Sequence, residues 1–174
     1  MTKRPNAVTF KGNPLTLVGP QLKAGDMAPN FACVTAGLEI VGIGQTPAKA
    51  RLFSVVPSLD TPVCSTQTKK FDESLAAMKD KVAAYTISLD LPFAQKRFCT
   101  TENVGNMQTL SDVHDHSFGQ NYGVLIEGLP LPLLSRAVFV VDKTGKITYA
   151  EYVPEVGSHP NYDAAAAALK AVAG

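Results

Sequence analysis

The sequence predicts an α/β fold in which a central sheet of parallel and antiparallel strands is flanked by helices. Two short, nearly continuous apolar runs, residues 52–56 and 82–89, enclose a helical pattern over residues 62–79. Such runs are typical of strands buried on both faces of a sheet, so we expect a parallel βαβ unit with a right-handed crossover. Later in the chain, two strand-like segments flank a turn and precede a final helix, which predicts an antiparallel ββα unit.

The chain length and composition fit one globular domain. Its 174 residues are enough for a sizeable core, and no linker or repeat divides them, so we expect a single domain over residues 1–174. The formal net charge of +1 gives no electrostatic reason to expect nucleic acid or an anionic membrane as a partner. No apolar segment follows the basic start, and no run approaches the roughly 20 residues of a membrane span, so we expect a cytoplasmic location.

An antiparallel hairpin is predicted near the N-terminus. Alternating segments within residues 8–18 flank a turn at residues 11–14, which carries Gly12, Asn13 and Pro14. Residues 30–44 carry a weaker pattern for two further strands.

The elements after the βαβ unit are predicted in turn. Leu91–Cys99 has the pattern of a second helix, with a proline in its first turn. A short strand near Gln108–Leu110 and a short helix ending at Gly123 precede the hairpin, whose turn is residues 142–145. The closing helix covers residues 161–173 and has an apolar face. The resulting order, β-α-β-α and then β-β-α, is the layout of a thioredoxin-like fold, here with an N-terminal β-hairpin.

Cys64 lies at the start of the first predicted helix. Thr61 can serve as N-cap and Pro62 as the first helical residue, which places Cys64 in the first turn, near free N–H groups at the positive end of the helix dipole. Helical spacing also puts Cys64 on the same face as the apolar residues Phe71 and Leu75. We therefore expect its side chain to point into the molecule.

The position of Cys64 allows two interpretations. The thiol is either a small buried hydrophobic group or a reactive group whose ionised form is favoured by the helix N-terminus and a nearby cation. Asp60 would oppose ionisation if it pointed inward, so it must face water or be offset. Cys99 is 99 − 64 = 35 residues further on, and it is either a packing residue at a helix end or the resolving partner of an oxidised Cys64.

Several stretches resemble one family. Residues 57–64, PSLDTPVC, resemble the P-x-x-x-T-x-x-C signature of peroxiredoxins, and residues 90–99, DLPFAQKRFC, are similar to a segment of the bacterial thiol peroxidases within that family. Three more stretches fit the same branch: FKGNPLTLVG, LLSRAVFVVD and HPNYDAA. The similarity covers essentially the whole chain.

The resemblance implies an atypical two-cysteine peroxiredoxin. Such enzymes reduce hydrogen peroxide and organic hydroperoxides, including alkyl and lipid ones, with no metal or organic cofactor. They form an intramolecular disulfide, are recycled by thioredoxin and assemble as homodimers. We expect the same of this chain. The apolar segment at residues 129–134 is compatible with bulky peroxides.

The resemblance also implies roles for five residues. Cys64 would be the peroxidatic nucleophile and Cys99 the resolving cysteine. Thr61 would hydrogen-bond the thiolate and the peroxide, Pro57 would shield the pocket floor, and Arg136 would supply positive charge. A disulfide needs Cα atoms within about 7 Å of each other, so we expect at least one helix to unwind locally when Cys64 and Cys99 join.

Other interpretations of the sequence remain. The two thiols could serve a peroxide-responsive redox sensor without turnover. His114 and His116 could suggest a metal site, although a solvated loop is the simpler interpretation. Cys33, in a predicted strand, has no counterpart in the two-cysteine scheme and is expected to be a buried structural thiol. Asp72 is expected on the outer face of its helix.

Overall fold

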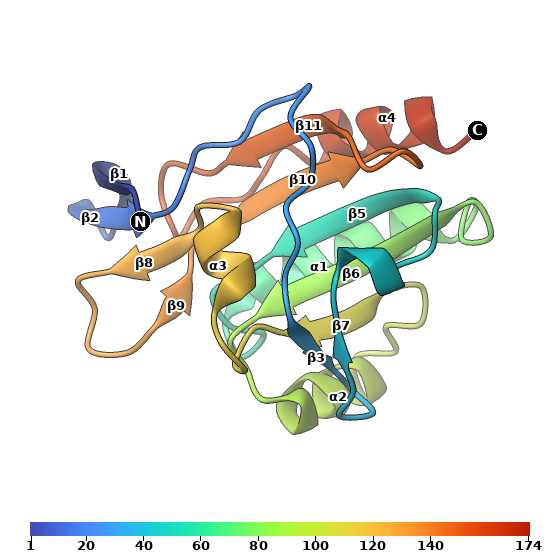
Figure 1. Cartoon of the computed structure of the whole chain (residues 1–174). Helices are drawn as coiled ribbons and strands as arrows, with labels where there is room; N and C mark the ends of the chain where they lie inside the picture. The colour runs from blue at the N-terminus through green and yellow to red at the C-terminus, as the bar shows by residue number, and fades with distance from the viewer.

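The computed structural model describes residues 1–174, which form two sheets and four α-helices (Figure 1). The larger sheet contains β3 (Cys33–Thr35), β4 (Ile40–Val41), β5 (Ala50–Val55), β6 (Val82–Ser88), β7 (Gln108–Ser111), β10 (Ala137–Val141) and β11 (Ile147–Tyr152). The smaller sheet contains β1 (Lys3–Phe10), β2 (Asn13–Val18), β8 (Leu125–Glu127) and β9 (Leu133–Leu134). The helices are α1 (Pro62–Leu75), α2 (Pro92–Thr101), α3 (Ser117–Asn121) and α4 (Tyr162–Val172), with a 3₁₀ turn at Ile43–Gln45.

The larger sheet has the predicted mixed pairing. Its strand order is β11-β10-β5-β6-β7-β3-β4. The strands β5, β6 and β7 are parallel, whereas β10 pairs antiparallel with both β5 and β11. Helix α1 connects β5 to β6, and α4 follows β11. The predicted thioredoxin-like fold, with its βαβ and ββα units, is therefore confirmed.

Helix α1 is shorter than predicted. The helical spacing continues to Met78, but the α-helix ends at Leu75 and the chain continues in tight turns. Backbone bonds of the i→i+3 kind, such as Met78 N–H to the Leu75 carbonyl at 3.0 Å, close these turns. No helix in the molecule combines the length and the apolar character that a bilayer crossing requires.

The central sheet separates two apolar cores. Alternate residues of β5 point to opposite faces, with Leu52 on one and Phe53 on the other. Helices α1 and α4 cover the Leu52 face, and α3 covers the Phe53 face (Figure 1). On the α3 face, Phe118 and Tyr122 stack with ring centroids 4.0 Å apart. Because both faces are covered, the strands that carry the site are held rigidly.

The N-terminal hairpin pairs with strands that the sequence did not predict. The pattern predicted the β1–β2 hairpin but missed β8 and β9, which are three and two residues long and lie among glycines and prolines. Strand β2 pairs antiparallel with β8, and Val8, Leu17 and Ile126 form a small core with Val156. This pairing fixes the hairpin at the end of the larger sheet where α1 begins (Figure 1).

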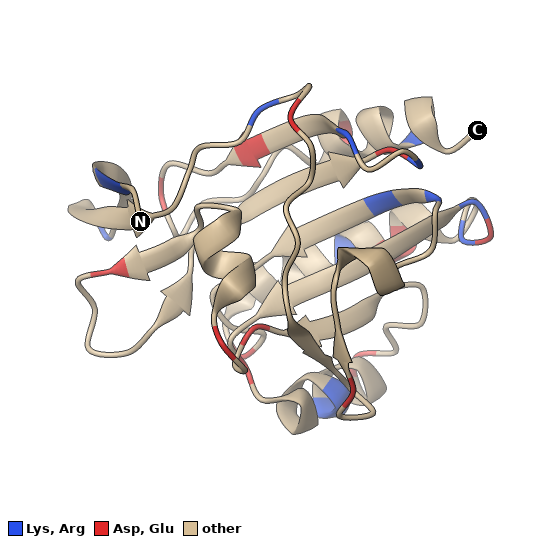
Figure 2. Ribbon diagram, in the orientation of Figure 1, with Lys and Arg blue, Asp and Glu red and all other residues tan.

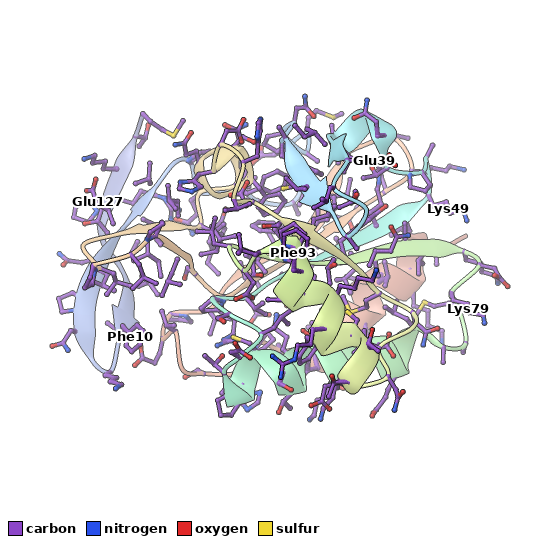
Figure 3. All side chains as sticks on the ribbon, turned by 90° about the horizontal axis from the view of Figure 1, so that it is seen from below. Phe10, Glu39, Lys49, Lys79, Phe93 and Glu127 are labelled. Atoms are coloured by element: carbon purple, nitrogen blue, oxygen red, sulfur yellow. The ribbon has the colours of Figure 1, made fainter.

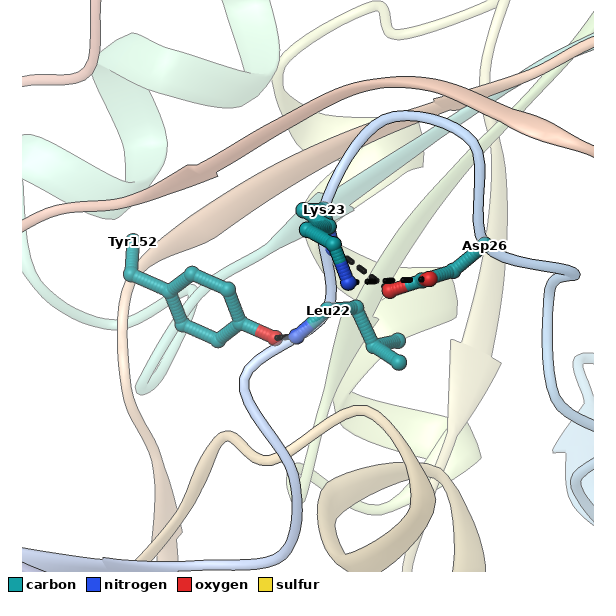
Figure 4. A network of polar contacts seen from close by, with 4 residues as sticks. All are labelled: Leu22, Lys23, Asp26 and Tyr152. Atoms are coloured by element: carbon teal, nitrogen blue, oxygen red, sulfur yellow. Dashed lines mark hydrogen bonds and ion pairs between the residues drawn. The ribbon is translucent and has the colours of Figure 1, made fainter.

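The segment that leads from the hairpin to the larger sheet is fixed by hydrogen bonds (Figure 4). The Tyr152 hydroxyl accepts from the Leu22 N–H at 2.9 Å and donates to the Tyr122 carbonyl at 2.7 Å. The carboxylate of Asp26 accepts from the Lys23 N–H at 2.9 Å. The bond of Leu22 to Tyr152 ties the segment to β11, and the bond between Lys23 and Asp26 closes a turn within the segment.

Charged side chains contribute little to this architecture. Figure 2 shows both signs scattered over the ribbon, with no extended stretch of one sign in that view. The ion pairs are Lys3–Glu127, Lys23–Asp26 and Lys69–Glu102. All three involve solvent-exposed side chains, and such pairs stabilise a fold by about 1 kcal/mol or less.

Candidate active site

Cys64 is a fully buried thiol in the first turn of α1. The chain leaves β5, passes through a loop and enters the helix at Pro62, so Cys64 lies at the carboxyl end of the parallel strands. Its side chain packs with Val56 and Leu59, and Phe98 of α2 packs against this cluster. The predicted inward face of α1 is confirmed, because its members are buried together: Cys64, Thr68, Phe71 and Leu75.

Arg136 faces the sulfur of Cys64 from the start of β10. Its Nη1 atom lies 3.3 Å from Sγ of Cys64, and Nε and Nη2 donate to the Val156 carbonyl at 3.1 and 2.8 Å. The side chain is only 2% exposed, and no carboxylate forms an ion pair with it. An unneutralised guanidinium in a buried site stabilises a neighbouring negative charge strongly.

Gln67 holds this guanidinium in place. Its Oε1 atom accepts from Arg136 Nη1 at 3.1 Å, and its Nε2 atom donates to Ser54 Oγ at 2.8 Å. The side chain is completely buried. Gln67 was not among the residues that the sequence patterns marked. Its position three residues after Cys64 was the available signal, since that spacing puts a polar group on the inward face of the helix.

The loop before α1 differs from the prediction at Thr61. Thr61 is the N-cap residue, as predicted, but its side chain makes no capping bond, because its hydroxyl donates to the Ser58 carbonyl at 2.8 Å. No hydrogen bond joins Thr61 to Sγ of Cys64 in this structure. Asp60 is exposed, and its N–H donates to Ser58 Oγ at 3.2 Å. Asp60 therefore faces water, where its charge is screened from the thiol.

Asp90 fixes the same loop from the end of β6. Its two carboxylate oxygens accept from the Ser58 hydroxyl at 2.8 Å and from the Leu59 N–H at 2.9 Å. The Ser88 hydroxyl also donates to it, at 2.8 Å. The segments that follow the neighbouring parallel strands β5 and β6 are thus tied together, which sets the geometry of the loop that precedes Cys64.

A cavity of about 330 Å³ opens next to the thiol. Three residues that the resemblance marked line it together: Pro57, Thr61 and Arg136. The tip of the N-terminal hairpin forms another wall through Phe10 and Lys11. Figure 3 shows Phe10 at the hairpin end of the molecule. Cys64 itself does not line the cavity, but Arg136, which contacts its sulfur, does, so a small molecule has a place next to this guanidinium.

Cys99 is not brought next to Cys64. It is half-buried on α2 and lines a separate hollow with Lys96 and Met107, and no disulfide is present. Burial, followed by the charge of Asp72, raises the pKa of the Cys99 thiol. Phe98 packs against both the Cys64 cluster and the core below α2, so it lies between the surroundings of the two thiols.

Asp72 itself corrects an expectation. The sequence placed it on the solvated face of α1, but it is 8% exposed. Its Oδ1 accepts from the N–H groups of Asn106 and Met107 at 2.6 and 3.1 Å. These bonds tie α1 to the loop before β7, a long-range partnership that helical periodicity cannot reveal.

Cys33 is a buried thiol in β3, as predicted. Its Sγ lies 3.6 Å from Oδ1 of Asp112, and burial, followed by the charge of Asp112, raises its pKa. Such a thiol is a poor nucleophile. His114 and His116 gather no third ligand, since the chain forms no group of three or more metal-ligating side chains.

The arrangement around Cys64 suits attack by sulfur on an O–O bond. Helix N–H groups and the Arg136 guanidinium present positive charge to the sulfur and to the cavity, where negative charge would develop on a departing oxygen. A thiol of this kind, on a thioredoxin-like fold with a cavity beside it, defines a peroxiredoxin, an enzyme that uses cysteine to reduce peroxides.

Comparison with known proteins agrees with this class. The Redoxin family matches residues 23–166. The thiol peroxidase of Listeria monocytogenes is 55% identical over 163 residues, covering 94% of this chain and 97% of that protein. The thiol peroxidase of Bacillus subtilis is 48% identical over 165 residues, covering 95% and 97%.

Solved structures give the same result. A peroxiredoxin-like protein from Aquifex aeolicus superposes with a TM-score of 0.88 at 46% identity, covering 96% of this chain and 97% of that one. A thiol peroxidase from Chromobacterium violaceum has a TM-score of 0.84 at 21% identity, covering 94% and 95%, and supports the fold alone. The chain belongs to the redoxin family and, within it, to the thiol peroxidases.

Proposed function

We propose that this enzyme reduces hydrogen peroxide and organic hydroperoxides, including alkyl and lipid ones, through Cys64 and Cys99, and that thioredoxin restores both thiols. The observation that carries the proposal is the 3.3 Å contact between Arg136 Nη1 and Cys64 Sγ, together with the cavity that Arg136 lines. A sulfur held against an unneutralised cation at a helix N-terminus is suited to nucleophilic attack.

In the first step, the Cys64 thiolate attacks one oxygen of the hydroperoxide. The S–O bond forms as the O–O bond breaks, and the departing oxygen leaves as water or an alcohol after taking a proton. Arg136 stabilises the charge on that oxygen. Thr61 lines the cavity and has a hydroxyl that can accept a hydrogen bond from the peroxide, and Pro57 walls off the floor.

In the second step, the sulfenic acid on Cys64 condenses with Cys99. The Cys99 thiol displaces the hydroxyl group, a disulfide forms and water leaves. The dithiol of thioredoxin then reduces this disulfide. The separate surroundings of the two cysteines support local unwinding of α1 or α2 before the bond can close.

We further propose that residues 1–174 act as one domain and that the enzyme works as a homodimer in the cytoplasm. Leu91 and Phe93, at the start of α2, are 55% and 67% exposed, and large exposed apolar side chains favour association (Figure 3). Free cysteines are typical of a reducing compartment.

The test is turnover of peroxide by purified variants with a thioredoxin system. Cys64→Ser should abolish peroxide consumption. Cys99→Ser should complete one round and then stop, because the sulfenic acid has no partner. Cys33→Ser is the matched control, since Cys33 is equally buried but remote from the cavity, and it should turn over. Full activity of Cys64→Ser would exclude this mechanism.

The same assay separates the enzyme from a redox sensor. A sensor would respond stoichiometrically and stop after one disulfide per chain even with thioredoxin present. Peptide mapping after peroxide treatment should show Cys64 joined to Cys99, and a map that joins other cysteines would contradict the proposal.

A further inference from the structure

The tip of the N-terminal hairpin is attached to the loop between β11 and α4 through Glu155. Oε2 of Glu155 accepts from the Thr9 hydroxyl at 2.7 Å, and Oε1 accepts from the Gly12 N–H at 3.2 Å. The backbones also pair, because Thr9 N–H donates to the Pro154 carbonyl at 2.8 Å and Val156 N–H donates to the Thr9 carbonyl at 2.9 Å. One carboxylate therefore bonds both Thr9, near the end of β1, and Gly12, in the turn of the hairpin.

Glu155 has no cationic partner in this arrangement. None of the ion pairs includes it, so its charge is satisfied by hydrogen bonds alone. These bonds, that of Thr9 first, lower the pKa of Glu155 and keep it ionised at neutral pH. Gly12 has a left-handed backbone conformation, with φ of +80°, which turns its N–H toward the carboxylate.

The attached tip is a wall of the catalytic cavity. Phe10 and Lys11 lie between the two bonded positions of the hairpin, and both line the cavity beside Arg136. The hairpin belongs to the smaller sheet, and its tip is joined to the loop after β11 by the carboxylate of Glu155 and by the backbone bonds of Thr9. Glu155 also lines the cavity.

We propose that Glu155 is a positioning residue that sets the hairpin wall of the peroxide cavity and thereby favours hydroperoxides with a bulky organic group. This inference rests on the proposed function. Hydrogen peroxide is small and can react at Cys64 and Arg136 without reaching the hairpin, whereas a bulky apolar group gains binding from contact with Phe10. The wall therefore affects one substrate class more than the other.

The neighbouring residue supplies a competing explanation. Val156 holds Arg136 through its carbonyl, so loss of Glu155 could also displace the guanidinium. That effect would slow the reduction of every peroxide equally, because Arg136 acts on the O–O bond itself. Comparison of two substrates therefore separates an effect on the hairpin wall from an effect on the position of the guanidinium.

The experiment measures kcat and KM for cumene hydroperoxide and for hydrogen peroxide with a thioredoxin system. Glu155→Gln should raise KM for cumene hydroperoxide about tenfold, the effect of about 1.4 kcal/mol of lost binding, and change kcat/KM for hydrogen peroxide less than about twofold. Phe10→Ala should show the same split without touching the carboxylate. Glu127→Gln, which removes an acid of the smaller sheet outside the cavity, should change neither.

Each other outcome overturns the inference. If Glu155→Gln lowered kcat/KM equally for both peroxides, its effect would be assigned to displacement of Arg136. If neither Glu155→Gln nor Phe10→Ala changed the kinetics, the hairpin would have no role in substrate binding. If the wild-type enzyme reduced hydrogen peroxide but not cumene hydroperoxide, the organic substrate range of the proposed function would fail together with the wall. If only the inference about Glu155 were wrong, the wild-type enzyme would still turn over both substrates.

Discussion

The guanidinium of Arg136 contacts Sγ of Cys64 at 3.3 Å and is held from behind by the Val156 carbonyl, which accepts from both Nε and Nη2. The planar guanidinium makes both contacts at once: Nε and Nη2 bond the loop that follows β11, and Nη1 contacts the sulfur. The charge is therefore aimed at the sulfur by two independent supports, the carbonyl and Gln67.

Arg136→Lys should reduce kcat/KM for hydrogen peroxide about 100-fold. The ammonium keeps the charge, but its single nitrogen cannot bond the Val156 carbonyl and contact the sulfur in the way that the three nitrogens of the guanidinium do. Stopped-flow peroxide reduction checks this. The matched control is Arg51→Lys, another buried arginine, which bonds Thr46 and the Asp142 carbonyl at the opposite end of β5. A rate unchanged in Arg136→Lys would contradict the role of the guanidinium.

Gln67→Met should lower the same rate constant about tenfold, since it keeps the volume of the side chain but removes the acceptor that orients Arg136. Gln95→Met is the control, because Gln95 is equally buried and bonds Ser88 and Leu110 instead. Both variants should lose stability to urea, and only the first should lose the rate of the peroxide step. Equal rates in the two variants would show that Gln67 only stabilises the fold.

Peroxide treatment should open the region around α1 and α2. Lys96 and Arg97 are exposed residues of α2 that trypsin recognises, and the helix protects them in the reduced state. Limited trypsin digestion should therefore cut at Lys96 and Arg97, within residues 92–103, faster after oxidation if α2 unwinds. A protease of broader specificity should cut within residues 60–67 faster if α1 unwinds, because that stretch has no lysine or arginine. Cys99→Ser should keep the reduced pattern after the same treatment. Identical digestion of oxidised and reduced wild type would contradict local unwinding.

Asp112 should make stability depend on pH. It is fully buried, and burial raises its pKa from 3.8 to about 6, although the N–H groups of Phe118 and Gly119 donate to its carboxylate. The folded state therefore binds more protons than the unfolded state between about pH 4 and 6. The contribution of this group, about 3 kcal/mol, is fully present below about pH 4 and is lost as pH rises through about 6.

Urea unfolding of wild type and Asp112→Asn between pH 4 and 7.5 checks this. The difference between the two free energies of unfolding should fall as pH rises to about 6 and then stay constant, because the amide does not titrate. Asp80→Asn, at an exposed turn, should show no such change. Parallel curves for wild type and Asp112→Asn would assign the dependence to other groups.

Periodicity predicted most of the fold because the strands of the larger sheet are buried on both faces. The βαβ unit, α2, the last hairpin and α4 all follow from local patterns of apolar residues. By contrast, β8 and β9 are too short to show a period, and pairing with the N-terminal hairpin is what makes them strands. The buried state of Asp72 likewise depends on a partner 34 residues away in sequence.

The sequence predicted those parts of the site that depend only on the position of a residue within its own helix or loop. The helix start and the inward face placed Cys64 correctly, and Asp60 was expected to face water or be offset. The contacts of Arg136 with Gln67 and Val156 join three separate parts of the chain. Distances of that kind arise only when the sheet and the helices assemble, so the supports of Arg136 were missed.

The place of Phe98 has a thermodynamic consequence for the proposed cycle. In the reduced state it packs against the cluster of Cys64, and the joining of Cys64 to Cys99 has to disturb that packing. Whatever stabilises the reduced form alone makes the disulfide a stronger oxidant, by about 30 mV for each 1.4 kcal/mol. In the proposed cycle, the packing of this phenylalanine therefore makes the disulfide easier for a dithiol such as that of thioredoxin to reduce.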